Sequence, residues 1–171
     1  LKARDPGLVF VFVGDGPARR ELQARCPGAV FAGMRTGVDL AEHYASGDVF
    51  LFPSTTETFG NVTAEAMASG LAVVAYDYAA ANALVCNGVS GRLAPLDDEH
   101  AFLRMASDLV RDPPVAARMG AAAREVAERH SWDSVVEQLE GVLLDVMRES
   151  LPLRAAAAPP VEPFVPMPFD Y

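Results

Sequence analysis

Cysteine and histidine are scarce in this sequence, and long apolar runs are missing. The two cysteines, Cys26 and Cys86, lie far apart, and the three histidines show no metal-ligand spacing. We therefore expect a reducing compartment, with neither a disulfide framework nor a metal site. No apolar run approaches the roughly 20 residues that span a bilayer. These absences together predict a cytoplasmic protein.

Basic side chains are also few, with 14 lysines and arginines against 23 aspartates and glutamates and a formal net charge of −9. Domains that bind nucleic acid normally carry a basic stripe that neutralises phosphates, and the sequence shows none. We therefore expect a solvated acidic surface and no nucleic-acid partner.

Short apolar runs alternate with helical patterns over the first half of the chain. Uninterrupted runs such as Leu8 to Val13 are typical of strands that are buried on both faces of a parallel sheet. The predicted strands cover residues 8–13, 29–33, 49–53, 71–75 and 91–94. This alternation predicts an α/β fold, a Rossmann-like parallel sheet with helices on both faces, followed by C-terminal helices.

The second half of the chain has helical patterns over residues 97–111, 114–130 and 132–148. The last of these carries an apolar stripe from Trp132 to Met147, for which packing against the domain is the favoured role. Prolines and alanines dominate from Leu151 onward and disfavour regular structure. We predict one domain over residues 1–150 and a disordered or extended tail over residues 151–171.

Three loops follow predicted strands, where ligands bind in open parallel sheets. In the third loop, Glu57 precedes a predicted helix and Glu65 lies within that helix, with Gly60 and Asn61 at the helix start between them. Free N–H groups and the helix dipole make such a start a phosphate site, and a carboxylate on each side can accept from hydroxyls. The pattern suits a nucleotide sugar. Plain helix capping explains the same residues, and the chemistry alone does not decide between the two.

Several motifs occur in an order and spacing that point to a known family. They are VFVGDGP, VFAG, YASGDVFLFPSTTETFGNVTAEAMASGLAVVAYD, GVSGRLAPLDD and RHSWDSVVEQL. Across residues 8–147 the chain resembles the retaining GT-B glycosyltransferases of glycosyltransferase family 4, whose E-x7-E motif is matched by Glu57 and Glu65. The resemblance implies a donor-binding domain that serves hexose transfer from a nucleoside-diphosphate sugar, without a metal or other cofactor. GDP-mannose is slightly favoured over a UDP-sugar.

The resemblance also implies a role for each residue of the third loop. Glu57 would position the donor sugar, with a catalytic role open, and Glu65 would bind the ribose hydroxyls. Val62 would lie near the diphosphate. Sugar hydroxyls would be held by the backbone of Phe59, Gly60 and Asn61.

The two earlier loops complete the implied site. Met34 and Arg35 fall where the family places the nucleobase, and Gly14 and Gly16 would line the same crevice. For the two glycines, a purely structural role in the turn is an equal alternative.

The chain begins at Leu1 rather than methionine, and we expect it to be an excerpt of a longer protein. The resemblance implies that basic residues for the diphosphate and an acceptor-binding N-terminal domain lie outside it. The expected partners are a nucleotide sugar, that N-terminal domain and a lipid-linked acceptor, which would bring the enzyme to the membrane periphery. Alone, the chain is expected to be inactive and to bind nucleotide weakly.

Two other functions are alternatives for a chain with this pattern. An NAD-dependent oxidoreductase requires a GxGxxG sequence after the first strand, whereas Gly14-Asp15-Gly16-Pro17 ends at GxGP. The remaining alternative is a non-catalytic interaction module that has kept a glycosyltransferase-like fold.

Overall fold

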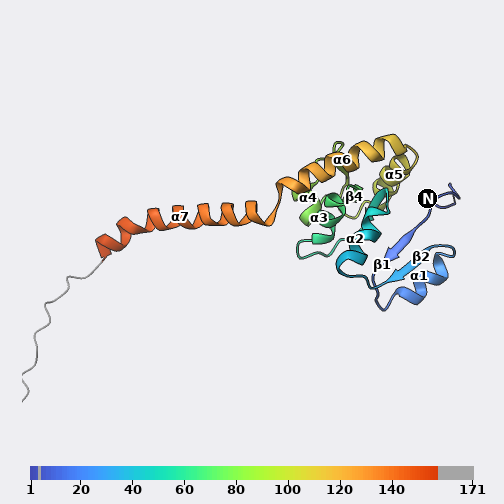
Figure 1. Cartoon of the computed structure of the whole chain (residues 1–171), viewed down its shortest axis with the longest axis horizontal. Helices are drawn as coiled ribbons and strands as arrows, with labels where there is room; N and C mark the ends of the chain where they lie inside the picture. Colours follow the sequence, from blue (N-terminus) through green and yellow to red (C-terminus); the bar gives the residue numbers. More distant parts are fainter. Residues whose placement is uncertain (4, 158–171) are drawn as a thin grey trace, which may run out of the picture. The chain divides into compact units, whose positions relative to one another are not determined.

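Parallel strands alternate with helices in the computed structural model, which describes residues 1–3 and 5–157 (Figure 1). The strands are β1 (Val11–Val13), β2 (Val30–Gly33), β3 (Val49–Phe52), β4 (Ala72–Tyr76) and β5 (Gly91–Ala94). The helices are α1 (Arg19–Arg25), α2 (Gly37–Ala45), α3 (Asn61–Ala68), α4 (Ala79–Leu84), α5 (Glu99–Val110), α6 (Pro113–Arg129) and α7 (Trp132–Ala157). The predicted α/β fold with C-terminal helices is confirmed.

The strands form two hydrogen-bonded sheets, and every pairing is parallel. One sheet joins β1 to β2, and the other has the order β3-β4-β5. The first strand is shorter than predicted, because only Val11–Val13 find partners on β2. In the part of the chain that the structure describes, the predicted single sheet is therefore replaced by two separately hydrogen-bonded parallel sheets.

Strand β4 forms the centre of the core, since all five of its residues are buried. Val73 and Ala75 pack on one face with buried residues of α3 and α6, such as Met67 and Ala123. The other face packs with buried residues of α5 and α6: Ala101, Phe102, Ala106, Leu109, Ala116 and Met119. An uninterrupted apolar strand is the sequence pattern that this two-sided burial requires.

The turn between α3 and β4 is built on Gly70. This glycine has a φ of 82°, in the left-handed region. Its N–H donates to Met67 O at 2.9 Å, and Leu71 N–H donates to Ala66 O at 3.1 Å, which is the Schellman pattern of helix ends. Gly70 therefore occupies the C′ position directly after the end of α3. Helix α6 crosses this turn so closely that Gly120 lies against the Gly70 carbonyl.

Helix α7 belongs to a second unit, Ser131–Tyr171, whereas the first unit is Leu1–His130. Taken by itself, the helix exposes its apolar stripe, with Trp132 80% exposed, and what covers that stripe stays a prediction. The helix extends through Pro152 to Ala157, beyond the predicted start of the tail, because the alanines that follow favour helix. The rest of the predicted tail, residues 158–171, lies outside the described residues. No helix within the described residues is long and apolar enough to cross a bilayer.

Candidate functional site at the start of α3

Gly60 forms the N-cap of α3 with φ 95° and ψ 56°, in the left-handed region. The helix starts with Thr63 N–H donating to Gly60 O at 3.0 Å, so the first N–H groups of the helix point outward without intrahelical acceptors. A Cβ at Gly60 would lie 3.6 Å from Glu57 Cγ and 3.7 Å from Ala80 Cβ. The missing side chain thus leaves space beside the Glu57 carboxylate, at the positive end of the helix dipole.

Glu57 is half-buried and held by neighbouring hydroxyl groups. Ser54 Oγ donates to Glu57 Oε1 at 2.7 Å, and the Tyr78 hydroxyl donates to the Glu57 carbonyl at 3.3 Å. The loop is also tied to the segment after β4, because Ala80 N–H donates to Phe59 O at 2.7 Å. These contacts fix the carboxylate next to the helix start.

A small cavity lies behind this loop, lined in part by Ser54, Glu57, Tyr78 and Ala79. Thr63 also lines it and is fully buried. Its hydroxyl has no hydrogen-bond partner within the described part of the chain. Buried polar groups are nearly always satisfied, and the cavity has room for about one water that could bond this hydroxyl.

Ala79, at the edge of the cavity, has a φ of 49°, in the left-handed region that alanine disfavours. We expect Ala79→Gly to raise the free energy of unfolding by about 1 kcal/mol, since the relief of strain exceeds the entropic penalty of glycine. Urea denaturation measures this. The control is Ala80→Gly, which removes a buried methyl from α4 and should lower stability by about as much. Equal losses in both variants would show that Ala79 stores no strain.

Glu65 lies further along α3, where its side chain is exposed. The hydroxyl of Tyr44, from α2, donates to Glu65 Oε2 at 3.1 Å. Burial raises the pKa of the Tyr44 phenol well above its ordinary value, and the Glu65 carboxylate raises it further, so the phenol stays a hydrogen-bond donor at neutral pH. The Tyr44 ring packs edge-on against Phe50, with ring centroids 5.9 Å apart.

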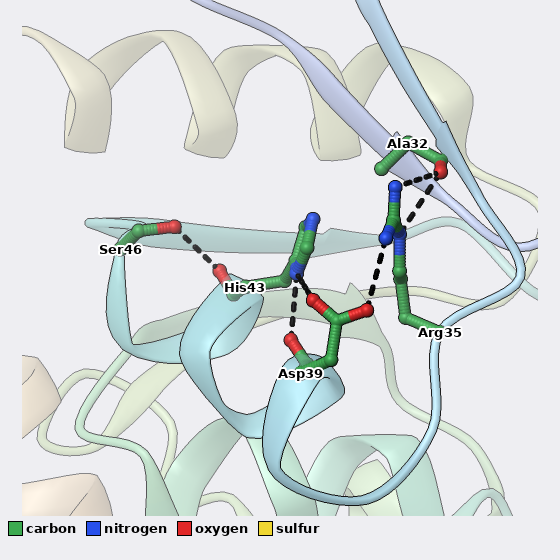
Figure 2. Close-up of polar contacts among 5 residues, drawn as sticks. All are labelled: Ala32, Arg35, Asp39, His43 and Ser46. Carbon is green, nitrogen blue, oxygen red and sulfur yellow. Dashed lines mark hydrogen bonds and ion pairs between the residues drawn. The ribbon is translucent and has the colours of Figure 1, made fainter.

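The loop that contains Met34 and Arg35 is fastened by the arginine itself (Figure 2). Arg35 Nε and Nη2 donate to Ala32 O at 3.0 and 2.8 Å, and Nη1 pairs with Asp39 Oδ2 at 2.9 Å. His43 Nδ1 lies 3.3 Å from the other carboxylate oxygen of Asp39. All three nitrogens of the Arg35 guanidinium thus contact other groups of the protein, whereas the Met34 side chain is 67% exposed. A nucleobase at this loop would meet Met34 and the backbone.

The first glycine loop lies next to this one. Gly14 has a φ of 121° and its N–H donates to Gly33 O at 2.8 Å, which joins the two loops. Gly16 N–H donates to Asp15 Oδ1 at 2.8 Å. A Cβ at either glycine would meet nothing within 4 Å. Both glycines therefore border open space, and the turn needs glycine only at position 14.

The structure thus groups the predicted residues in two sets, which α2 connects. Gly14 and Gly16 lie beside the loop of Met34 and Arg35. The second set, at the start of α3, contains Glu57, Phe59, Gly60, Asn61, Val62 and Glu65. Helix α2 begins directly after the Met34 loop and reaches Glu65 through Tyr44.

Ser54, Tyr44 and Tyr78 were missed as site residues. Ser54 and Tyr44 occur inside the matched motif YASGDVFLFPSTTETFG, but nothing in the sequence distinguishes their hydroxyls from ordinary surface or core groups. Among the described residues, no group of three or more His, Cys, Asp or Glu side chains could hold a metal. The metal independence implied by the resemblance stays a prediction.

The sequence of this chain is similar to those of one family of known proteins. A family model described as "Glycosyl transferases group 1" matches residues 1–112. A "GDP-mannose-dependent alpha-mannosyltransferase" of Mycobacterium tuberculosis is 41% identical over 133 residues, which cover 77% of this chain and 34% of the relative. The chain spans about a third of the length of such curated relatives.

Two solved structures share the fold. Sucrose-phosphate synthase from Thermosynechococcus elongatus has a TM-score of 0.71 and 26% identity, over 86% of this chain and 41% of that one. Anabaena HepE, solved in complex with UDP-glucose, has a TM-score of 0.67 and 26% identity, over 84% of this chain and 43% of that one.

Proposed function

Because this chain belongs to the family of group 1 glycosyl transferases, we propose that it is the donor-binding part of an enzyme that moves a hexose from a nucleoside-diphosphate sugar to an acceptor. The transfer retains the configuration of the sugar and uses no metal or other cofactor. The acceptor is lipid-linked and is bound by an N-terminal domain, and the enzyme works on the cytoplasmic side, at the membrane periphery.

The observation that carries this proposal is the start of α3. A left-handed glycine, Gly60, opens space at the positive end of a helix, and a carboxylate held by a hydroxyl flanks it on each side. A diphosphate at the helix start receives backbone N–H groups. Glu57 then accepts from hydroxyls of the sugar, and Glu65 from hydroxyls of the ribose.

The same arrangement supports the chemical step. Negative charge develops on the diphosphate as its bond to the sugar breaks, and the N–H groups and dipole of α3 stabilise that charge. Glu57 is held beside the sugar by Ser54. The name of the Mycobacterium tuberculosis relative supports GDP-mannose as the donor, while the UDP-glucose complex of Anabaena HepE represents the UDP-sugar alternative.

Titration of the purified chain with GDP and with UDP, followed by saturation-transfer NMR, tests donor binding. We expect weak binding, with GDP bound more tightly than UDP. Glu65→Ala should weaken binding about tenfold or more, because a hydrogen bond to a charged group contributes about 1.5–3 kcal/mol. Glu42→Ala, which removes an exposed carboxylate from α2, is the control and should leave the affinity unchanged.

Two results would overturn parts of this proposal. Binding of neither nucleotide would favour the non-catalytic interaction module. Hexose transfer by the purified chain alone would show that the reaction needs no groups from outside it.

A further inference from the structure

The hydroxyl of Tyr44 contacts the carboxylate that we assign to the ribose. The two residues are 21 positions apart in the sequence and lie on neighbouring helices, and the hydroxyl donates to Glu65 Oε2 at 3.1 Å. The second oxygen, Oε1, receives no described hydrogen bond within residues 1–3 and 5–149, and the side chain is exposed. One carboxylate oxygen is therefore engaged, and the other is open to a ligand.

The tyrosine is itself fixed in place by aromatic packing. Its ring contacts Phe50 on β3 at an interplanar angle of 64°, and Phe50 stacks on Phe52 with ring centroids 5.6 Å apart. Such pairs restrict the ring to one orientation. A glutamate on a helix surface otherwise samples many rotamers, and its immobilisation on ligand binding lowers affinity.

Helix α2 also carries the contacts that hold the loop of Met34 and Arg35, which we assign to the nucleobase. Arg35 pairs with Asp39 on the first turns of α2 at 2.9 Å, and Tyr44 lies in the last turn of the same helix. Helix α2 therefore determines both the position of the loop after β2 and the direction of the Glu65 carboxylate.

We propose that Tyr44 is a positioning residue for ribose recognition, whose hydroxyl holds Glu65 so that its free oxygen accepts from the ribose hydroxyls. This inference rests on the proposed function, because ribose binding by Glu65 is part of it. Tyr44 touches no ligand atom and acts through Glu65 alone. The phenol is protonated at neutral pH, as a donor must be, because phenols ordinarily titrate at about pH 10 and burial raises the pKa of Tyr44 further.

The test compares GDP and UDP with their 2′,3′-dideoxy forms on the purified chain by saturation-transfer NMR. Tyr44→Phe keeps the ring against Phe50 and removes only the hydroxyl. We expect it to weaken binding of the ribonucleotides about fivefold, the factor typical of one hydrogen bond, and to leave binding of the dideoxy forms unchanged. Ser46→Ala is the control, because it removes another hydroxyl at the end of α2, one that donates to His43 O, and it should change neither affinity.

The outcomes separate the inference from the function on which it rests. In a Glu65→Gln background, Tyr44→Phe should cause no further loss of ribose discrimination. Equal weakening of ribo and dideoxy nucleotides by Tyr44→Phe would assign the hydroxyl a structural role and overturn the inference alone. If the unmodified chain binds no nucleotide, or if Glu65→Ala leaves ribose discrimination intact, the proposed function of Glu65 falls and the inference falls with it.

Discussion

Replacement of Gly120 by alanine is expected to lower the free energy of unfolding by about 3 kcal/mol or more. A Cβ at this position of α6 would lie 2.0 Å from Gly70 O and 3.0 Å from Gly70 C. Both are backbone atoms of the turn between α3 and β4, which the Schellman hydrogen bonds hold in place. Relief of the overlap must move α6 away from β4, and such overpacking typically costs about 1–3 kcal/mol or more. The midpoint of urea denaturation, followed by circular dichroism, measures the loss.

Gly141→Ala is the matched control for this experiment. Gly141 is also a helical glycine, in α7, and a Cβ there would meet nothing within 4 Å. The substitution should raise helix stability by about 1 kcal/mol, the difference in helix propensity. If Gly120→Ala were as stable as the unmodified chain, the close approach of α6 to the turn would be wrong.

Gly60→Ala is expected to weaken binding of GDP-mannose about tenfold or more, that is by about 1.4 kcal/mol. The new methyl group would occupy the space beside Glu57, where Glu57 Oε2 is 3.7 Å from the Cβ position. That space is where we place the donor sugar. The loss should be smaller for GDP, which lacks the sugar. Competition saturation-transfer NMR with both ligands gives the two affinities.

The fold also loses stability in this variant, because alanine is strained by about 1–2 kcal/mol at a left-handed φ. Gly88→Ala is the control for that strain: its φ of 85° is similar to the 95° of Gly60, and a Cβ there would meet nothing within 4 Å. The free energy of unfolding should fall by a similar amount in the two variants. Only Gly60→Ala should have a lower affinity for GDP-mannose. Equal affinities in the two variants would exclude a sugar at Gly60.

The order of strands and helices could be predicted because it depends on short-range patterns. An apolar run such as residues 71–75 has the length and composition of a doubly buried strand, and Gly70 before it identifies the end of a helix. The helical pattern that begins near Asn61 likewise placed Glu57 in the loop before α3 and Glu65 within the helix, because both belong to one continuous segment.

Contacts between elements distant in sequence were not predictable in the same way. The bond from Tyr44 to Glu65 depends on how α2 and α3 pack, which local patterns do not encode. Arg35 is a similar case: its loop was predicted, but the sequence did not show that its guanidinium would turn back to Ala32 O and Asp39. The position of Glu57 in a loop before a helix could thus be predicted from sequence, whereas the hydroxyl groups that hold Glu57 and Glu65 required the structure.

The two-sided burial of β4 has a consequence for how this site tolerates mutation. The segment that holds the loop of Glu57 and Phe59 follows β4 directly, through Tyr78 and Ala80. The loop that we propose for the donor sugar is therefore attached to the strand where substitutions are expected to disturb the core most. The loop of Met34 and Arg35 instead follows β2, which contains no buried residue. Sequence change at that loop is therefore expected to disturb the core least, and the loop that we propose for the nucleobase should tolerate substitution better than the loop that we propose for the sugar.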